Sequence, residues 1–245
     1  MGIKLKKINK LSVVIPIYKE GNNIIILTKK ISRYIDFKKY EIIFVDDNSK
    51  DNTLKNFLFL KKKNKRVKLI IRKNKKKDLS KSCIVGFKKA KYKHILVMDG
   101  DLQHSPKYIK IFISHFQKYN PDIIVGCRSI FGESNNGLNL LRSIMSKILI
   151  FFLNNVLWKA TSDPMSGFFL FKKKIFLNSK NKLFGKGYKI LADLIYSNKN
   201  KLVIKDVNIN FYKRKNGKSK MNLIVLFLLI QFIFKKILDK KNDKI

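Results

Sequence analysis

Two carboxylates and an amide stand at alternate positions after an apolar run in HILVMDGDLQHSP, residues 94–106. If the strand predicted there continues, the side chains of Asp99, Asp101 and Gln103 project from one face of it. Carboxylate and amide oxygens are suitable ligands for Mg²⁺ or Mn²⁺. The alternative is helix capping, but the Ser-Pro pair that follows already meets that need. Half-buried carboxylates without a cation would be unfavourable, so the stretch predicts a divalent-metal site.

A net charge as high as that of this chain ordinarily indicates binding to nucleic acid or to an anionic membrane, but here the signal is diluted. There are 55 Lys and Arg residues against 16 Asp and Glu, a formal net charge of +39. The lysines are spread along the chain among many Asn, Ile and Phe residues, which indicates a compositional bias rather than a binding patch. Only six of the basic residues are Arg, so an Arg retained in this chain is worth inspecting, because its planar fork suits phosphate in a way that Lys cannot reproduce.

The elements that must position these residues alternate along the first half of the chain. Short β-branched runs predict strands over 12–18, 41–47, 67–73, 94–99 and 122–128. Apolar residues at helical spacing predict helices over 22–35, 53–62, 79–91 and 105–118. This alternation predicts an α/β fold with a mostly parallel, doubly wound sheet, whose ligands bind beyond the carboxyl ends of the strands. Asp46, Asp47 and Asp99 are expected at those ends.

The second half is less regular. We expect a helix over 138–158, a turn and strand over 163–173, a helix over 187–197 and a strand over 201–214. No GxGxxG fingerprint follows the first strand, and NGKSK at 216–220 lacks the earlier glycine of a P-loop.

The tail contains an apolar run of twelve positions, 223–234, in which Gln231 is the one polar residue, followed by Lys235 and Lys236. The run is short of the roughly 20 residues that span a bilayer, and the pattern favours a helix lying at the interface of an anionic membrane. A core helix or half of a partner-dependent anchor are the alternatives. Residues 144–158 are a second candidate for lipid contact, and core packing explains them nearly as well.

The two cysteines, Cys83 and Cys127, form no close-spaced pair, which favours a reduced, cytoplasmic setting. The N-terminal stretch 1–20 is basic and then apolar but lacks a small-residue cleavage site, so we do not expect a signal peptide. No linker divides the chain. We expect one catalytic domain over 1–221, with a nucleotide-sugar half over about 1–128 and an acceptor half over about 129–221, and a terminal helix over 222–245.

Several stretches together resemble family 2 inverting glycosyltransferases of the GT-A fold, and within them the polyprenol-phosphate (dolichol-phosphate) mannose synthase group. The similarity runs from about Leu11 to Met221. Its parts are VVIPIYKE at 13–20, VDDNSKDNT at 45–53, MDGDLQHSP at 98–106, GCRS at 126–129, LRSIMS at 141–146, DPMSGF at 163–168, GYKI at 187–190 and FYKRKNGKSK at 211–220. Lys19 and Asp78 depart from the usual pattern, where Asn and Gly are common.

The resemblance implies a role for each matching position. The base and ribose of a nucleotide sugar would be lined by Pro16, Tyr18, Glu20 and Asp47. The metal that bridges the donor diphosphate, Mg²⁺ or Mn²⁺, would be held by Asp99, Asp101 and Gln103. The phosphates of donor or acceptor would be faced by Arg128, Arg142, Ser146, Arg214 and Lys220. The residues expected to act directly in catalysis are Asp101, Arg128, Arg214 and Asp193.

Asp193 occupies the place of the base in many family 2 enzymes that act on hydroxyl acceptors. On a phosphate acceptor it would instead orient a loop or an Arg, and a plain exposed helix carboxylate is an equally good interpretation. A phosphate monoester with a second pKa of about 6 is already largely anionic at neutral pH, so a strong general base is unnecessary.

The implied reaction moves a sugar, mannose from GDP-mannose, onto a polyprenyl monophosphate with inversion. We therefore expect a peripheral membrane enzyme at the cytoplasmic face, with a possible small membrane partner subunit and no specific nucleic acid. The alternatives are a related transferase that uses UDP-glucose or UDP-N-acetylglucosamine and, from a different class, a basic nucleic-acid-binding module.

Overall fold

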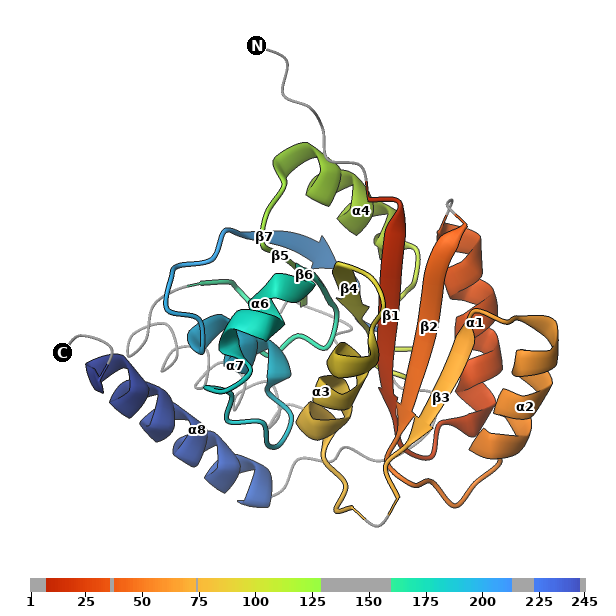
Figure 1. The fold of residues 1–245 in the computed structure, drawn as a ribbon, viewed down its shortest axis with the longest axis horizontal. Helices are drawn as coiled ribbons and strands as arrows, with labels where there is room; N and C mark the ends of the chain where they lie inside the picture. The colour runs from red at the N-terminus through yellow and green to blue at the C-terminus, as the bar shows by residue number, and fades with distance from the viewer. Residues whose placement is uncertain (1–7, 36–37, 74, 129–159, 213–222, 243–245) are drawn as a thin grey trace.

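A twisted sheet runs through the centre of the computed structural model, which describes residues 8–35, 38–73, 75–128, 160–212 and 223–242 (Figure 1). Its seven strands within these ranges lie in the order β3-β2-β1-β4-β6-β5-β7. They are β1 Lys10–Ile17, β2 Lys39–Asp46, β3 Val67–Ile71, β4 His94–Val97, β5 Ile123–Arg128, β6 Phe169–Lys172 and β7 Ile204–Ile209.

The predicted mostly parallel sheet is confirmed. Strands β3, β2, β1 and β4 are parallel neighbours, and β5 is parallel to β7. The exception is β6, which lies between β4 and β5 and is antiparallel to both. The parallel neighbours bring the carboxyl ends of β1, β2 and β4 to one edge of the sheet.

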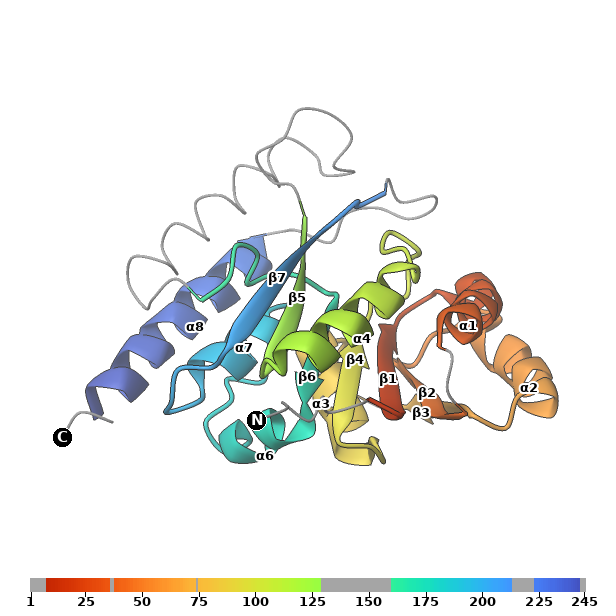
Figure 2. The ribbon, with the colours of Figure 1, turned by 90° about the horizontal axis from the view of Figure 1, so that it is seen from above.

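Helices cover both faces of the sheet, as apolar strands on both sides require (Figure 2). They are α1 Gly21–Tyr34, α2 Thr53–Lys63, α3 Leu79–Lys89, α4 Tyr108–Tyr119, α6 Lys173–Ser179, α7 Ile190–Tyr196 and α8 Leu223–Asn242. One core packs alternate strand residues against α1 and α4, through residues such as Leu27 and Phe112. The other core packs the opposite strand face against α3, α6, α7 and α8, through residues such as Phe87, Phe176 and Phe232.

The structure corrects one expectation that bears on the site. Strand β4 ends at Val97, so Asp99 and Asp101 lie in the irregular segment that follows it rather than on one face of a strand, and Leu102 adopts a left-handed φ of 64°. The reason is that both neighbouring strands stop pairing there: the ladders of β4 with β1 and with β6 end at Val97.

Other boundaries also differ. Helix α4 begins at Tyr108 without a side-chain cap, so Ser105 and Pro106 form a turn before it rather than its cap. Strand β7 is shorter than predicted. The tail is a 20-residue helix, α8, as expected, whereas the helix predicted over 138–158 lies outside the described residues. Within the part of the chain that the structure describes, no helix is both long and apolar enough to cross a bilayer.

Candidate active site

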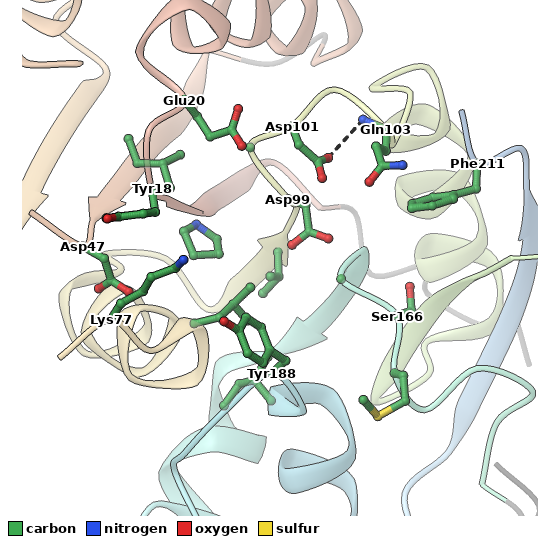
Figure 3. Close-up of a pocket in the computed structure, with 18 of the residues that line it drawn as sticks. Tyr18, Glu20, Asp47, Lys77, Asp99, Asp101, Gln103, Ser166, Tyr188 and Phe211 are labelled. Atoms are coloured by element: carbon green, nitrogen blue, oxygen red, sulfur yellow. Dashed lines mark hydrogen bonds between the residues drawn. The ribbon is translucent and has the colours of Figure 1, made fainter. Parts of the chain in front are cut away.

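A pocket opens at the carboxyl ends of the parallel strands β1, β2 and β4, where the fold predicts ligand binding (Figure 3). Eight of the residues singled out from the sequence line it: Pro16, Tyr18, Glu20, Asp47, Asp99, Asp101, Gln103 and Arg128. They come from four separate parts of the chain. The pocket is completed by other residues, among them Lys77, which lies outside the quoted stretches, and Ser166, Tyr188 and Phe211, which lie within them but had no role assigned.

Asp47 is held in one orientation by three donors. Its Oδ1 accepts hydrogen bonds from the Arg72 guanidinium and from the Ser82 hydroxyl, and its Oδ2 accepts from the main-chain N–H of Asp78 at 2.7 Å. Both charged side chains of the Arg72–Asp47 pair are buried. Arg72 is thus committed to Asp47 and not to a phosphate. Asp47 presents a fixed acceptor to the pocket, which suits an N–H or O–H group of a ligand.

The neighbouring Asp46, also expected at the strand end, does not line the pocket. Its carboxylate accepts hydrogen bonds from the main-chain N–H of Ser49 at 3.0 Å and from the Ser49 hydroxyl, which shapes the turn after β2. Burial raises the pKa of Asp46 above its usual value, against the effect of these hydrogen bonds. Of the two adjacent carboxylates, Asp47 alone faces the ligand site.

The turn after β4 brings Asp99, Asp101 and Gln103 together at the pocket although they do not share a strand. Asp101 is 9% exposed and its Oδ1 accepts from the main-chain N–H of Gln103 at 3.1 Å. The Gln103 amide nitrogen donates to the carbonyl oxygen of Tyr212 at 2.9 Å. That bond directs the nitrogen away and leaves the amide oxygen as the atom suited to a cation.

The oxygen atoms of Asp99, Asp101 and Gln103 suit a divalent cation that is also coordinated by a bound ligand. Among the described residues no three His, Cys, Asp or Glu side chains converge into a complete metal site. Two carboxylates and an amide oxygen would provide only part of the coordination sphere. Mg²⁺ is usually bound in this way, by one or two carboxylates together with water and substrate phosphates. Asp99, Asp101 and Gln103 fit such a partly open site.

His104, to which the sequence analysis assigned no role, lies beside Asp99. Its Nε2 lies 3.5 Å from Asp99 Oδ2, and its ring is buried between the rings of Phe168 and Phe211. Gly167 approaches the same carboxylate so closely that a methyl group there would overlap it. The position of Asp99 is therefore set by long-range packing.

Arg128 also lines the pocket, and its guanidinium is fixed. Its Nε and Nη2 donate to the two carboxylate oxygens of Asp163 at 2.6 and 2.8 Å, and its guanidinium carbon lies 5.4 Å from the centroid of the Phe211 ring. Burial works to lower the pKa of Arg128, but the adjacent Asp163 carboxylate outweighs it and raises that pKa. Asp163 belongs to the quoted DPMSGF stretch, yet its pairing with Arg128 could not be predicted from sequence.

The side of the pocket formed by the segments after β1 and before α3 has a cationic and aromatic wall. The ammonium of Lys77 lies 4.1 Å from the centroid of the Tyr18 ring, and Figure 3 shows it reaching into the pocket. Tyr188 also lines the pocket, and burial together with the carboxylates of Asp78 and Asp47 raises the pKa of its hydroxyl. A cation beside aromatic faces suits a base and its phosphates.

Asp193 is buried and is not among the residues that line the pocket, so its interpretation as a plain exposed helix carboxylate is wrong and its surroundings favour the alternative that it orients a loop. It is 2% exposed, accepts hydrogen bonds from the main-chain N–H groups of Phe184 and Gly185, and pairs with Lys236 of α8 at 2.9 Å. With these partners it orients a loop. Four further expected phosphate ligands lie outside the described residues: Arg142, Ser146, Arg214 and Lys220.

Comparisons with known proteins agree with this architecture. The dolichol-phosphate mannosyltransferase of Pyrococcus furiosus is 34% identical over 228 residues, covering 92% of this chain and 63% of the relative. The Saccharomyces cerevisiae dolichol-phosphate mannosyltransferase is 31% identical, covering 90% of this chain and 84% of the relative.

Among solved structures, glucosyl-3-phosphoglycerate synthase from Mycobacterium tuberculosis, in complex with Mn²⁺, UDP-glucose and phosphoglyceric acid, has a TM-score of 0.70 at 15% identity. It covers 92% of this chain and 80% of that one. This likeness supports the GT-A-like fold. The family model for "Glycosyl transferase family 2" matches residues 12–178. The family match and these relatives agree with the Asp-lined pocket at the carboxyl ends of the parallel strands, and the chain belongs to glycosyl transferase family 2.

Proposed function

We propose that the protein transfers mannose from GDP-mannose to a polyprenyl monophosphate such as dolichyl phosphate, with inversion at the anomeric carbon. The observation that carries the proposal is the convergence of Asp99, Asp101 and Gln103 with Asp47 and Arg128 in one pocket. The named activity of the archaeal and yeast relatives supports the choice of donor and acceptor. The chain spans 63% of the length of the archaeal relative, and we propose for it the activity that the relative's name states.

On this proposal different parts of the pocket bind the base and ribose, the metal ion and the phosphates of the acceptor side. Pro16, Tyr18, Glu20 and Asp47 bind the base and ribose, with Lys77 beside Tyr18. Asp99, Asp101 and Gln103 hold Mg²⁺ or Mn²⁺, which when bound offsets the charge developing on the leaving diphosphate. Arg128, held by Asp163, faces the phosphates of the acceptor side. The residues proposed to join it there are Arg142, Ser146, Arg214 and Lys220.

The acceptor needs no strong general base. A phosphate monoester has a second pKa of about 6 and is nucleophilic as the dianion at neutral pH. A buried and fully partnered Asp193 is consistent with this, because the chain then needs no base at that position. Catalysis on this proposal comes from positioning and from electrostatic stabilisation of the diphosphate.

Helix α8 supports peripheral membrane association at the cytoplasmic face. Ile230, Phe234 and Leu238 follow one another at helical spacing and are 58, 64 and 46% exposed, while Phe232 on the other side is buried. An exposed apolar stripe on a helix that ends in lysines suits the interface of an anionic bilayer. A small membrane subunit that docks on the same stripe is a further part of this proposal.

The domain division is also a proposal. Residues 1–221 form the catalytic unit, with a nucleotide-sugar half to about residue 128 and an acceptor half beyond it, followed by the terminal helix over 222–245. Phe232 of α8 belongs to the same core as α3 and α7, which favours a helix packed on the catalytic unit over one tethered freely beside it.

The test mixes purified protein, a polyprenyl phosphate and Mn²⁺ or Mg²⁺ with labelled nucleotide sugars headed by GDP-mannose, and counts label extracted into organic solvent. Asp101→Asn should abolish metal-dependent transfer, and Asp122→Asn, a carboxylate at the far end of β5, is the matched control. Label from UDP-glucose or UDP-N-acetylglucosamine instead would establish the alternative donor. No lipid-soluble label with any donor, despite nucleotide-sugar binding, would contradict the acceptor.

If the function were nucleic-acid binding, Asp101→Asn would slightly increase the affinity for polyanions, because it removes a negative charge. On our proposal, adhesion of this basic chain to nucleic acid is weak and disappears with salt, because it rests on counterion release alone. Tight binding to nucleic acid at high salt would contradict the proposal.

A further inference from the structure

The loop of residues 182–188, which enters α7, is held at both ends by carboxylates. At one end Asp193 accepts a hydrogen bond from the main-chain N–H of Phe184 at 2.9 Å and another from Gly185 at 2.7 Å, one on each oxygen. The loop then delivers Tyr188 to the wall of the pocket. The orientation of Asp193 therefore bears on the shape of a site that it does not touch.

At its other end the loop is tied to the nucleotide side of the pocket. Asp78 accepts from the main-chain N–H of Gly187 at 3.0 Å, and the Gly187 carbonyl accepts from the N–H of Ser80 at 2.9 Å. Asp78 in turn donates its own N–H to Asp47. Gly187 has φ +83°, a conformation that favours glycine and lets the loop turn sharply toward Tyr188.

The partner of Asp193 comes from the C-terminal helix. The ammonium of Lys236 lies 2.9 Å from Asp193 Oδ1 and donates to the carbonyl of Lys182 at 2.9 Å, and its side chain has no exposed surface. One turn earlier Phe232 packs edge-on against Phe184, with ring centroids 6.0 Å apart. Figures 1 and 2 both show α8 beside α7.

A buried ion pair of this kind is sensitive to the loss of either partner. Two charges removed from water are stable only together, and deleting one leaves the other uncompensated. Without Lys236, the buried Asp193 carboxylate keeps only neutral donors, and movement of the carboxylate toward water would pull on the Phe184 and Gly185 amides.

We propose that Lys236 and Asp193 are positioning residues for the donor pocket: through this ion pair, helix α8 holds the loop that carries Tyr188 and meets Asp78. The inference rests on the proposed function, in which the pocket takes a nucleoside-diphosphate sugar. On this inference helix α8, which we expect to contact the membrane that carries the acceptor, also supports the pocket that binds the donor.

The test measures the affinity of the full-length protein for GDP and UDP with Mn²⁺ by calorimetry, together with thermal unfolding. Lys236→Met should weaken nucleotide binding by about tenfold at a temperature where the protein remains folded, because substitutions in a network that couples two parts of a protein change affinity by about 2- to 30-fold. Lys174→Met is the matched control, since that side chain is 63% exposed. Hydrogen exchange of residues 182–189 should be faster in Lys236→Met than in the control.

Asp193→Asn provides an independent second variant, because it keeps the side-chain shape but deprives one loop N–H of its acceptor. It should weaken nucleotide binding to a similar degree. Nucleotide affinity equal to wild type in a folded Lys236→Met or Asp193→Asn protein, with a lower Tm alone, would overturn the inference and leave the proposed function standing. Wild-type protein that bound neither nucleotide would overturn the proposed function and the inference with it.

Discussion

Replacing Lys189 by Met should stabilise the protein, and the gain should depend on pH. Lys189 is 3% exposed, its ammonium has no hydrogen-bond partner among the described residues, and it lies 5.8 Å from the centroid of the Phe232 ring. Burial lowers the pKa of this ammonium from its ordinary 10.5 to about 7. A lowering of that extent corresponds to about 5 kcal/mol of stability that the charged form costs the folded state.

The sign follows from proton counting. Between about pH 7 and 10.5 the unfolded chain keeps the Lys189 proton and the folded protein loses it, so stability rises with pH across this window. Below pH 7 both states are protonated and the full cost is present. Met has nearly the same length and no charge, so Lys189→Met should gain about 4 kcal/mol at pH 7 but only about 1 kcal/mol at pH 10.

Urea unfolding of wild type and Lys189→Met at pH 7 and pH 10, at constant ionic strength, measures both differences in the free energy of unfolding. Lys174→Met, at an exposed position, controls for the change in net charge and should shift the free energy of unfolding little at either pH. An equal gain at the two pH values, or a loss at pH 7, would refute the reasoning.

Three further changes test other parts of the structure. Gly167→Ala should abolish metal-dependent transfer with little loss of Tm, because the added methyl group displaces the Asp99 carboxylate; retained Mn²⁺-dependent activity would contradict this. Arg128→Lys loses the two-point contact with Asp163, so unfolding free energy should fall by about 1–3 kcal/mol and transfer should drop, as chemical denaturation and the label assay would measure. Burial favours a higher pKa for Glu41, but hydrogen bonds from Lys68, Ser12 and the Lys91 N–H outweigh it and lower that pKa below the usual 4.5. The ionised Glu41 therefore stabilises the fold above pH 4.5, and this stabilisation is lost as the pH falls through the lowered pKa. Glu41→Gln should therefore flatten acid unfolding measured by circular dichroism, and an unchanged acid transition would count against this role.

Local pattern was sufficient for most elements of the fold. The β-branched runs that became β1, β2 and β5 and the amphipathic stretch that became α1 were predicted within a few residues. Each is set by the periodicity of its own side chains. Strand ends were less predictable, because β4 ends where its neighbours stop pairing and not where its own residues change character.

Much of the candidate site followed from the order of residues along the chain. Asp47 and Asp99 stand just after apolar strands, and parallel strands bring such positions to one edge of the sheet. The pocket contains both. Lys77 and His104 gave no comparable signal, since a lysine in a lysine-rich loop and a single histidine resemble many others.

The sequence by itself determined the alternation of strands and helices, the placement of acidic residues after the strands and the apolar terminal helix, because each depends on residues close together in the chain. Only the tertiary structure decided the partners of the buried charges. In the fold Arg72 pairs with Asp47, Arg128 with Asp163 and Lys236 with Asp193. A buried charge must be paired by whatever residue packing brings near, and that residue is chosen by the whole fold.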